Sequence, residues 1–186
     1  MDETKRRIAA ATWDLHRTVG PAETTISAIA ERAGVQRLTV YRHFPDEVSL
    51  FRACARHDLT VNPLPDPERW AAVADPAERL RAALAELYAY YRRSEAMTAN
   101  LLRDVPRMPA LAAVFNENIL PFLEGAMQTL LAAWSAAQGQ DRLRTAALGH
   151  ALDFNTWRSL ARGQGLSDDE AVTVMVALVC CAAAEA

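Results

Sequence analysis

One segment constrains the fold more than any other: residues 24–51, TTISAIAERAGVQRLTVYRHFPDEVSLF. The apolar residues of its first part recur at helical spacing and predict a short helix with one buried face. Gly34 ends that helix, because the residue just past a helix end often needs a positive φ, which glycine adopts without a Cβ clash. Residues 36–43 predict a second short helix, and small Ala30 lets the two helices cross closely. The segment therefore predicts a helix-turn-helix.

The same segment resembles the DNA-binding domain of the tetracycline-repressor (TetR) family of bacterial regulators. The residues that carry the resemblance are Thr25, Ile29-Ala30, Ala33-Gly34-Val35, Thr39-Val40-Tyr41 and His43-Phe44-Pro45. This long composite pattern is specific and covers roughly the first 55 residues, whereas the rest of the chain matches the family in size and helical character. The resemblance implies a homodimeric transcriptional regulator, most often a repressor, that a small effector releases from DNA.

Composition and patterning predict an all-α protein. Apolar residues make up 51% of the chain, which argues against disorder. Ala, Leu and Arg are plentiful and favour helices, and no alternating apolar run is bounded by hairpin residues. Three prolines within residues 63–67 forbid a helix there. We therefore expect a helix-turn-helix DNA-binding domain at 1–60 and a helical ligand-binding and dimerisation domain at 61–186.

Start and stop signals predict about nine helices in all. They are expected at residues 3–18, 26–33, 36–43, 46–59, 77–93, 97–105, 110–137, 143–162 and 167–184, with a further short helix at 68–73. Pro121 lies inside one of these segments and predicts a kink or a split, because proline removes a helix hydrogen bond.

Charge and cysteine content narrow the class of protein. Residues 1–57 hold nine Lys and Arg against seven Asp and Glu, and the rest holds eleven against sixteen, within a net charge of −3. This asymmetry is expected if only the first part meets phosphate. The three cysteines form no disulfide or metal pattern, so no cofactor or metal is expected. With no apolar signal region and no apolar stretch near the about 20 residues of a membrane span, we expect a soluble, cytoplasmic protein.

The second helix of a helix-turn-helix enters the major groove with its first residues at the base edges. Arg37 is expected to read guanine, because its planar fork matches the O6 and N7 acceptors. Gln36 can pair with adenine, and Leu38 can contact a thymine methyl group. The resemblance implies that a further set mainly touches phosphates, with one more charge nearby: Thr25, Thr39, Tyr41 and His43, with Arg42.

Some positions depart from the family pattern or stay open. The family usually has lysine where this chain has Glu47, which removes a phosphate contact and adds a repulsive charge. Ser or Thr often stands where this chain has Gln36. His16 replaces a usual aromatic residue and is expected to be a packed core histidine. The basic residues 5–7 either reach the DNA backbone or form an ordinary solvated helix end.

The resemblance implies dimerisation through the last two helices and an effector pocket in the second domain. The final helix is apolar nearly all round, so either a partner or an intramolecular core must cover its second side. The expected interface residues are Leu148, Ala151, Leu152, Val172, Val176 and Val179. The candidate pocket residues are Trp70, Tyr88, Tyr91, Met97, Leu101, Phe115, Phe122, Trp134, Phe154, Trp157 and Arg158. Aromatic walls suit an apolar organic ligand, and plain core packing is the alternative for each of them.

Two other classes of function are alternatives to a repressor with a small-molecule effector. One is a DNA-binding regulator without such an effector, controlled by a protein partner or by abundance. The other is an enzyme, and we do not expect one, because no GxSxG, HExxH, Walker or dinucleotide pattern occurs and the four histidines have no metal spacing.

Overall fold

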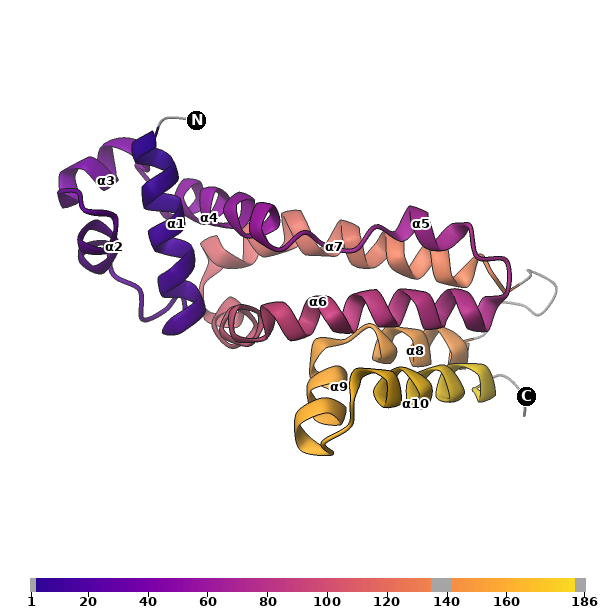
Figure 1. The fold of residues 1–186 in the computed structure, drawn as a ribbon. Helices are drawn as coiled ribbons and strands as arrows, with labels where there is room; N and C mark the ends of the chain where they lie inside the picture. Colours follow the sequence, from indigo (N-terminus) through magenta and orange to yellow (C-terminus); the bar gives the residue numbers. More distant parts are fainter. Residues whose placement is uncertain (1–2, 135–141, 183–186) are drawn as a thin grey trace. The chain divides into compact units, whose positions relative to one another are not determined.

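The computed structural model describes residues 3–134 and 142–182 of the chain. Within these ranges it contains ten α-helices and no strand, which confirms the all-α class (Figure 1). The helices are α1 (Glu3–Thr18), α2 (Ile26–Ala33), α3 (Arg37–His43), α4 (Glu47–Val61), α5 (Pro67–Ala71), α6 (Pro76–Asp104), α7 (Pro109–Leu131), α8 (Arg142–Ala151), α9 (Phe154–Arg158) and α10 (Asp168–Cys181). A 3-10 turn, η1 (Val105–Arg107), follows α6, and a π-helical turn, η3 (Ser159–Gly163), follows α9.

The chain divides into two compact units. Unit 1 comprises residues 1–63 and 94–120, and unit 2 comprises residues 64–93 and 121–186. Unit 1 therefore contains all of α1 to α4 together with the end of α6 and the start of α7. This division does not test the domain boundary predicted near residue 60, which stays a prediction.

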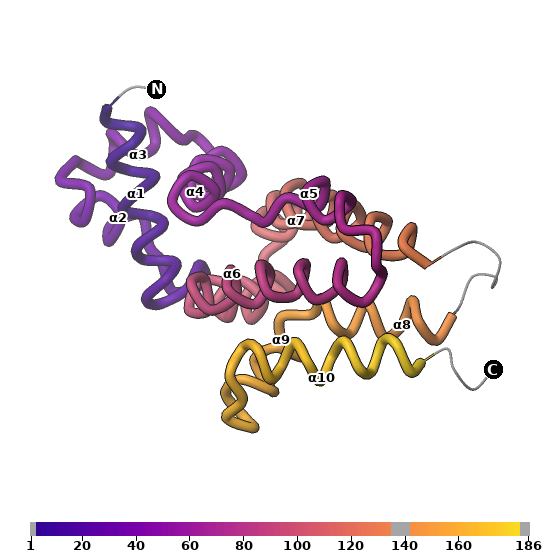
Figure 2. The backbone as a smooth tube through the Cα atoms, turned by 45° about the vertical axis from the view of Figure 1, so that its right-hand side comes forward, coloured from indigo at the N-terminus to yellow at the C-terminus, as the bar shows by residue number. Residues whose placement is uncertain are grey.

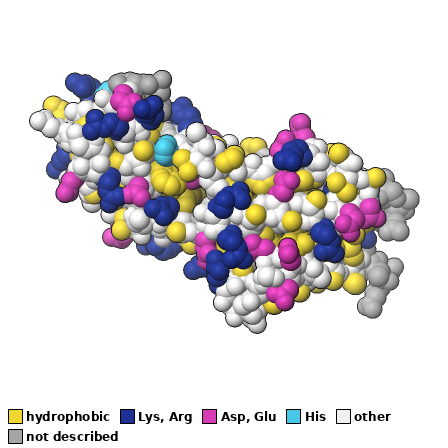
Figure 3. Space-filling view, viewed as in Figure 1, with side chains coloured by type: hydrophobic (Ala, Val, Ile, Leu, Met, Phe, Trp, Pro, Cys, Tyr) yellow, Lys and Arg dark blue, Asp and Glu magenta, His cyan; other side chains and the backbone are white. Residues whose placement is uncertain are grey.

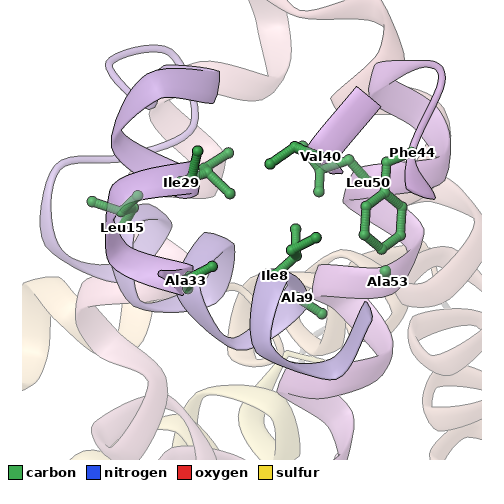
Figure 4. Close-up of a cluster of buried hydrophobic side chains, with 11 residues drawn as sticks. Ile8, Ala9, Leu15, Ile29, Ala33, Val40, Phe44, Leu50 and Ala53 are labelled. Carbon is green, nitrogen blue, oxygen red and sulfur yellow. The ribbon is translucent and has the colours of Figure 1, made fainter. Parts of the chain in front are cut away.

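A single apolar core holds α1 to α4 together in unit 1. Ile8 and Val40 are fully buried and Ile29 is 1% exposed, each coming from a different helix. Figure 4 shows these side chains converging with those of α4 on one interior. Burying each such side chain is worth roughly 1.5–3 kcal/mol. Ala30 is buried where α2 and α3 pack, as the helix-turn-helix pattern predicts, and a larger residue there would push the two helices apart.

Capping side chains fix the helix ends in unit 1, together with Gly34, which the sequence predicts to end α2. The Thr25 hydroxyl accepts the Ala28 N–H at 3.1 Å and caps α2. The Asp46 carboxylate accepts the Ser49 N–H at 2.7 Å and caps α4. Gly34 follows α2 with a φ of 62°, in the left-handed region that glycine alone adopts easily. These caps fix where α2 ends and where α4 begins.

His16 is a core histidine, as predicted. It is 2% exposed, its ring centroid lies 5.6 Å from that of Phe51, and its Nδ1 lies 3.5 Å from Cys54 Sγ. Burial lowers the pKa of His16 to about 4, and the charge of Asp104 opposes that shift only in part. The imidazole is therefore neutral inside the fold at physiological pH.

A polar clasp joins the end of α1 to the end of α6 within unit 1. Asn100 donates to the His16 carbonyl at 2.9 Å, and Arg103 donates to the Val19 carbonyl at 3.1 Å. The fully buried Asp104 accepts the Ala22 N–H at 3.0 Å, and the guanidinium of its neighbour Arg103 lowers the pKa of this carboxyl. The clasp satisfies carbonyls that the end of a helix leaves without partners.

Gly20 is required where the clasp meets the loop after α1. Its φ is +96°, and an added Cβ would collide with the guanidinium of Arg103.

Two further contacts join α4 to α7 in the same unit. Phe51 packs against Leu111 and Val114, and Arg52 forms two hydrogen bonds with one carboxylate of α7 at 2.9 and 2.6 Å.

The region predicted as two helices, 77–93 and 97–105, is one helix, α6, so that prediction is wrong. No glycine or proline interrupts these residues, and the hydroxyls of Ser94 and Thr98 meet at 3.1 Å one turn apart. Nothing breaks the ladder of backbone hydrogen bonds. α7 continues through the exposed Pro121 without a split, and the predicted kink there stays a prediction. The predicted helices at 110–137 and 167–184 include residues 135–137 and 183–184, which lie outside the described ranges.

The predicted helix at 143–162 is interrupted, so that prediction is also wrong. Asp153 leaves the helical path and caps α9 by accepting two backbone N–H groups at 2.8 and 3.0 Å. The hydroxyls of Tyr88 and Tyr91 donate to the last two carbonyls before the break, at 2.9 and 2.6 Å. These side chains replace the helix hydrogen bonds that the break removes.

In unit 2, α8 and α10 pack side by side, as Figures 1 and 2 show from two directions. Ser167 and Glu170 form a capping box at the start of α10. Asp168 accepts two hydrogen bonds from Arg92 at 2.6 and 2.7 Å and one from the Trp157 indole at 3.0 Å. The start of α10 is thus fixed to α6 and α9. Among the described residues, no helix is both long and apolar enough to span a bilayer.

Candidate nucleic-acid interface

The outer face of α3 is exposed and chemically mixed. Leu38 is 76% exposed and Tyr41 46% exposed, while Val40 between them is fully buried. Arg37 and Arg42 are exposed as well. The core fixes α3 through Val40, which leaves Leu38 and Tyr41 on the exposed side of the helix.

The remaining predicted contact residues flank this face. Thr39 and His43 are half-buried, and Gln36 is exposed at the N-cap position of α3 with its side chain making no capping hydrogen bond. Thr25 is exposed at the start of α2. Its oxygen accepts a backbone N–H, which leaves the hydroxyl hydrogen available to donate. The structure therefore places all eight predicted DNA-contacting residues in one helix-turn-helix and leaves the polar groups at its start exposed.

The arginines of the helix-turn-helix unit fall into two groups. Within the part of the chain that the structure describes, Arg37 and Arg42 have no carboxylate partner. In contrast, Arg17 and Arg32 both pair with Asp14, and Arg7 donates to backbone carbonyls at the end of α2. Arg37 and Arg42 are thus the cations that α3 itself offers to an anionic partner.

Acidic residues limit how basic this surface is. Asp46 and Glu47 are exposed at the start of α4. In Figure 3, carboxylates (magenta) lie among Lys and Arg side chains (dark blue) along the visible face. A partner with many phosphates would therefore meet a few placed cations rather than a uniformly basic patch.

The candidate pocket residues do not all lie in one unit. Met97, Leu101 and Phe115 belong to unit 1, and the other eight belong to unit 2. Trp70, Tyr88, Tyr91, Phe154 and Trp157 are buried, Phe122 and Trp134 are half-buried, and Arg158 is exposed.

The buried aromatic residues of unit 2 form a packed cluster. The ring of Tyr91 lies 5.4 Å from that of Phe154 and 5.9 Å from that of Trp157, between centroids. The hydroxyls of Tyr88 and Tyr91 are occupied by the carbonyls at the end of α8, and Trp70 donates to Glu86 at 3.1 Å. These side chains have the contacts of core residues, and an effector pocket among them stays a prediction.

The six predicted interface residues are buried within the chain itself. Leu148, Ala151, Leu152, Val172, Val176 and Val179 are each 0–6% exposed in the isolated subunit. The outward side chains of the same helices are different ones. Leu143 on α8 is 59% exposed, and Val174 and Leu178 on α10 are each 46% exposed. These three side chains are not among the predicted interface residues, although the four-residue spacing of Val174 and Leu178 places those two on one face.

The N-terminal helices match the model of a known protein family. Residues 8–54 match the family model described as "Bacterial regulatory proteins, tetR family". The matched range runs from α1 into α4 and includes all of α2 and α3. In a comparison with curated proteins, no relative matched the sequence.

Solved structures share the fold along the whole chain. A TetR-like transcriptional regulator from Rhodococcus sp. RHA1 is 20% identical with a TM-score of 0.68, covering 98% of this chain and 97% of that one. A TetR-family regulator from Streptomyces coelicolor, also 20% identical at 0.68, covers 100% and 84%. A Saccharomonospora viridis protein solved in complex with choline is 18% identical at 0.64, covering 96% of both chains. The family model thus matches the helices of the helix-turn-helix, and these solved structures share the fold of the whole chain.

Proposed function

We propose that this regulator is a cytoplasmic, homodimeric repressor that binds a near-palindromic operator and is released by a small apolar or aromatic effector. The observation that carries the proposal is the exposed outer face of α3, where Arg37 and Arg42 have no carboxylate partner among the described residues. A cation kept exposed on a recognition helix is suited to bases or phosphates.

Base reading falls to the first turn of α3. Arg37 can donate two parallel hydrogen bonds to guanine, and Leu38 offers an apolar contact to a thymine methyl group. Gln36 has an amide that is not used in capping and can pair with adenine. A side chain as exposed as Leu38 has no role in the core, which favours a role in recognition.

Phosphate contacts fall to the residues around that turn. Thr25, Thr39, Tyr41 and His43 can each donate one hydrogen bond, and Arg42 adds a charge. Glu47 opposes the approach of the backbone at the start of α4. We therefore expect moderate affinity per subunit, so that tight binding depends on two linked subunits.

TetR-family regulators typically form homodimers. In this chain the outward apolar residues of α8 and α10, Leu143, Val174 and Leu178, are the ones that a second copy can cover. The predicted interface residues beneath them, such as Val176, then support the interface from inside the subunit. A dimer presents two copies of α3 to one duplex and gives the operator its two-fold symmetry.

A specific observation also favours the second candidate, a regulator without a small-molecule effector. Tyr88, Tyr91, Phe154 and Trp157 are already packed and hydrogen-bonded. An effector among them must displace these contacts. A thermal-shift screen of apolar and aromatic compounds, with choline included because the Saccharomonospora viridis protein binds it, distinguishes the two candidates.

Selection from a library of random DNA duplexes tests the proposed function. The purified protein should enrich one motif built from two related, inverted half-sites. Fluorescence anisotropy should then show tighter binding to the selected duplex than to a shuffled duplex of the same composition, in the same salt. Enrichment of no motif, with equal binding to both duplexes, would contradict sequence-specific regulation.

A further inference from the structure

The turn between α2 and α3 is closed by a defined set of backbone hydrogen bonds. The Val35 N–H donates to the Ala30 carbonyl at 2.9 Å, and the Gly34 N–H donates to the Glu31 carbonyl at 3.1 Å. This is a Schellman arrangement around a left-handed glycine. It uses the carbonyls of Ala30 and Glu31 and leaves those of Ala33 and Gly34 to other donors.

Arg7 of α1 supplies the missing donors. Its Nη2 donates to the Ala33 carbonyl at 2.5 Å and to the Gly34 carbonyl at 3.3 Å. A positive charge at the C-terminal end of a helix also suits the helix dipole. An added Cβ at Gly34 would lie 2.9 Å from the same Nη2, so the guanidinium passes close to this residue.

Arg7 itself is held in a fixed register. Ile8, the next residue, is fully buried in the core of unit 1, so the direction of the Arg7 side chain from α1 is set. Arg7 and Asp14 lie along one shallow groove with Arg32, Ala33 and Gly34. The guanidinium therefore crosses from a rigid helix to the turn.

The turn is short enough to pass this constraint to α3. Only residues 34–36 separate the end of α2 at Ala33 from the start of α3 at Arg37. Val35 of the turn packs against the core, and Arg7 donates hydrogen bonds to the carbonyls of the turn. Rotation of the Ala33 and Gly34 peptides would turn the first residues of α3, which carry the base-reading groups.

We propose that Arg7 is a positioning residue for DNA recognition, which holds the α2–α3 turn so that Arg37 and Leu38 meet the base edges in the right orientation. The inference rests on the proposed function, since it concerns how the same surface reads DNA. It differs from both roles that the sequence leaves open for this residue, a phosphate contact and an ordinary solvated helix end. Arg7 acts on the protein backbone and is not a phosphate contact.

The test compares Arg7→Gln with a matched variant, Arg32→Gln. Arg32 forms an ion pair with Asp14 between the same two helices but does not touch the turn, so its loss affects packing alone. Binding is measured by anisotropy on the duplex selected by the parent protein and on its shuffled version, across a salt series. Arg7→Lys, which keeps the charge but replaces the guanidinium with an ammonium group on a shorter side chain, is measured alongside, and circular dichroism confirms that each variant is folded.

We expect Arg7→Gln to lower the ratio of selected to shuffled affinity roughly tenfold, about the size of one lost base contact, with an unchanged salt slope. Arg7→Lys should recover part of that ratio, and Arg32→Gln should leave it unchanged. Equal weakening on both duplexes, with the salt slope reduced by about one, would make Arg7 a phosphate contact. An unaltered ratio in Arg7→Gln would overturn the inference as well.

A second measurement needs no DNA. Amide hydrogen exchange in the free protein should be faster in α3 for Arg7→Gln than for Arg32→Gln. Equal exchange in the two variants would show that Arg7 does not hold the turn. If the parent protein selects no duplex, the proposed function fails and the recognition role of Arg7 fails with it. A parent that selects a duplex while the Arg7 variants keep its selectivity refutes only the role of Arg7.

Discussion

The outer faces of α3 and α10 are both exposed in the described chain, and their chemistry differs. α3 presents Arg37 and Arg42 beside Leu38. α10 presents Val174 and Leu178, with no charged residue after its first turn. A face with placed cations suits a phosphate-rich partner, and an apolar stripe suits another protein surface.

The two helices also differ in how many of their residues are buried in the core. α3 turns one residue, Val40, into the core and leaves most of its others outside. α10 buries Ala171, Val172, Met175, Val176 and Val179 and still has apolar residues on the outside. The α10 residues predicted for the interface belong to this buried set. A helix that is apolar all round does not show in its sequence which side faces its own subunit, so that prediction stays open.

The largest expected effect comes from charging that inner stripe. Val176 is 6% exposed in the isolated chain, so Val176→Glu leaves an uncompensated charge inside the subunit. We expect a loss of about 3–5 kcal/mol in the free energy of unfolding, measured by urea denaturation. A Val176→Glu protein that is as stable as its parent but monomeric would return Val176 to the subunit interface.

Charging the outer stripe should separate the subunits without unfolding them. Leu178 is 46% exposed, so Leu178→Glu costs little within the monomer but places a charge in the proposed interface. We expect a folded monomer by sedimentation and circular dichroism, with operator affinity lower by about a hundredfold or more, because the second DNA-binding unit no longer adds its effective concentration. A folded variant that stays dimeric would move the interface away from α10.

On α3, the expected effect is smaller and depends on DNA sequence. Arg37→Ala should cost about 1–3 kcal/mol on the selected duplex and relax the preference at one position of each half-site. Anisotropy on a panel of single-base variants of that duplex measures this. Uniform weakening across the whole panel would instead make Arg37 a phosphate contact.

Acid should lower the stability of unit 1 through protonation of His16. α10 has no such histidine. Burial lowers the pKa of His16 to about 4, against about 6.5 in the unfolded chain, so the unfolded state binds more protons between these values. Its contribution to stability is therefore complete above pH 6.5 and is lost as the pH falls toward 4. We expect a slope of up to about 1.4 kcal/mol per pH unit in this window.

The control for this pH dependence is His16→Phe, which keeps an aromatic ring against Phe51 but cannot bind a proton. Urea denaturation of parent and variant at several pH values gives the difference. An identical pH slope in the two proteins would mean that other groups account for it.

The smallest effect is expected at Glu47, on the acidic edge of the DNA-facing surface. Glu47→Lys should tighten binding to selected and shuffled duplexes alike and steepen the salt dependence by about one unit. A salt series of anisotropy titrations measures it. An unchanged slope would place Glu47 away from the DNA backbone.

Local patterns predicted the parts of the fold that are determined locally. The ends of α1, the end of α2 at Gly34 and the start of α10 near Ser167 were all readable, because each depends on residues within one turn. The helix-turn-helix and its outward residues were readable for the same reason. The motif fixes both the glycine and the buried valine that orient α3.

The remaining features depend on contacts between distant residues. The break before Asp153 is stabilised by two tyrosines more than 60 positions away, and Arg7 reaches a turn 26 positions along the chain. Asp104 meets a backbone N–H 82 positions away. No spacing in the sequence marks such pairs, and for this reason the positioning role of Arg7 required the structure.

The central claim is that the two subunits of a dimer each contribute one α3 to the same duplex, and that other helices join the subunits. Hydroxyl-radical footprinting of the parent protein on its selected duplex tests it most directly. We predict two protected regions whose centres lie about 10–10.5 base pairs apart, or a multiple of that spacing, on one side of the DNA. A single protected region at saturating protein would contradict the account.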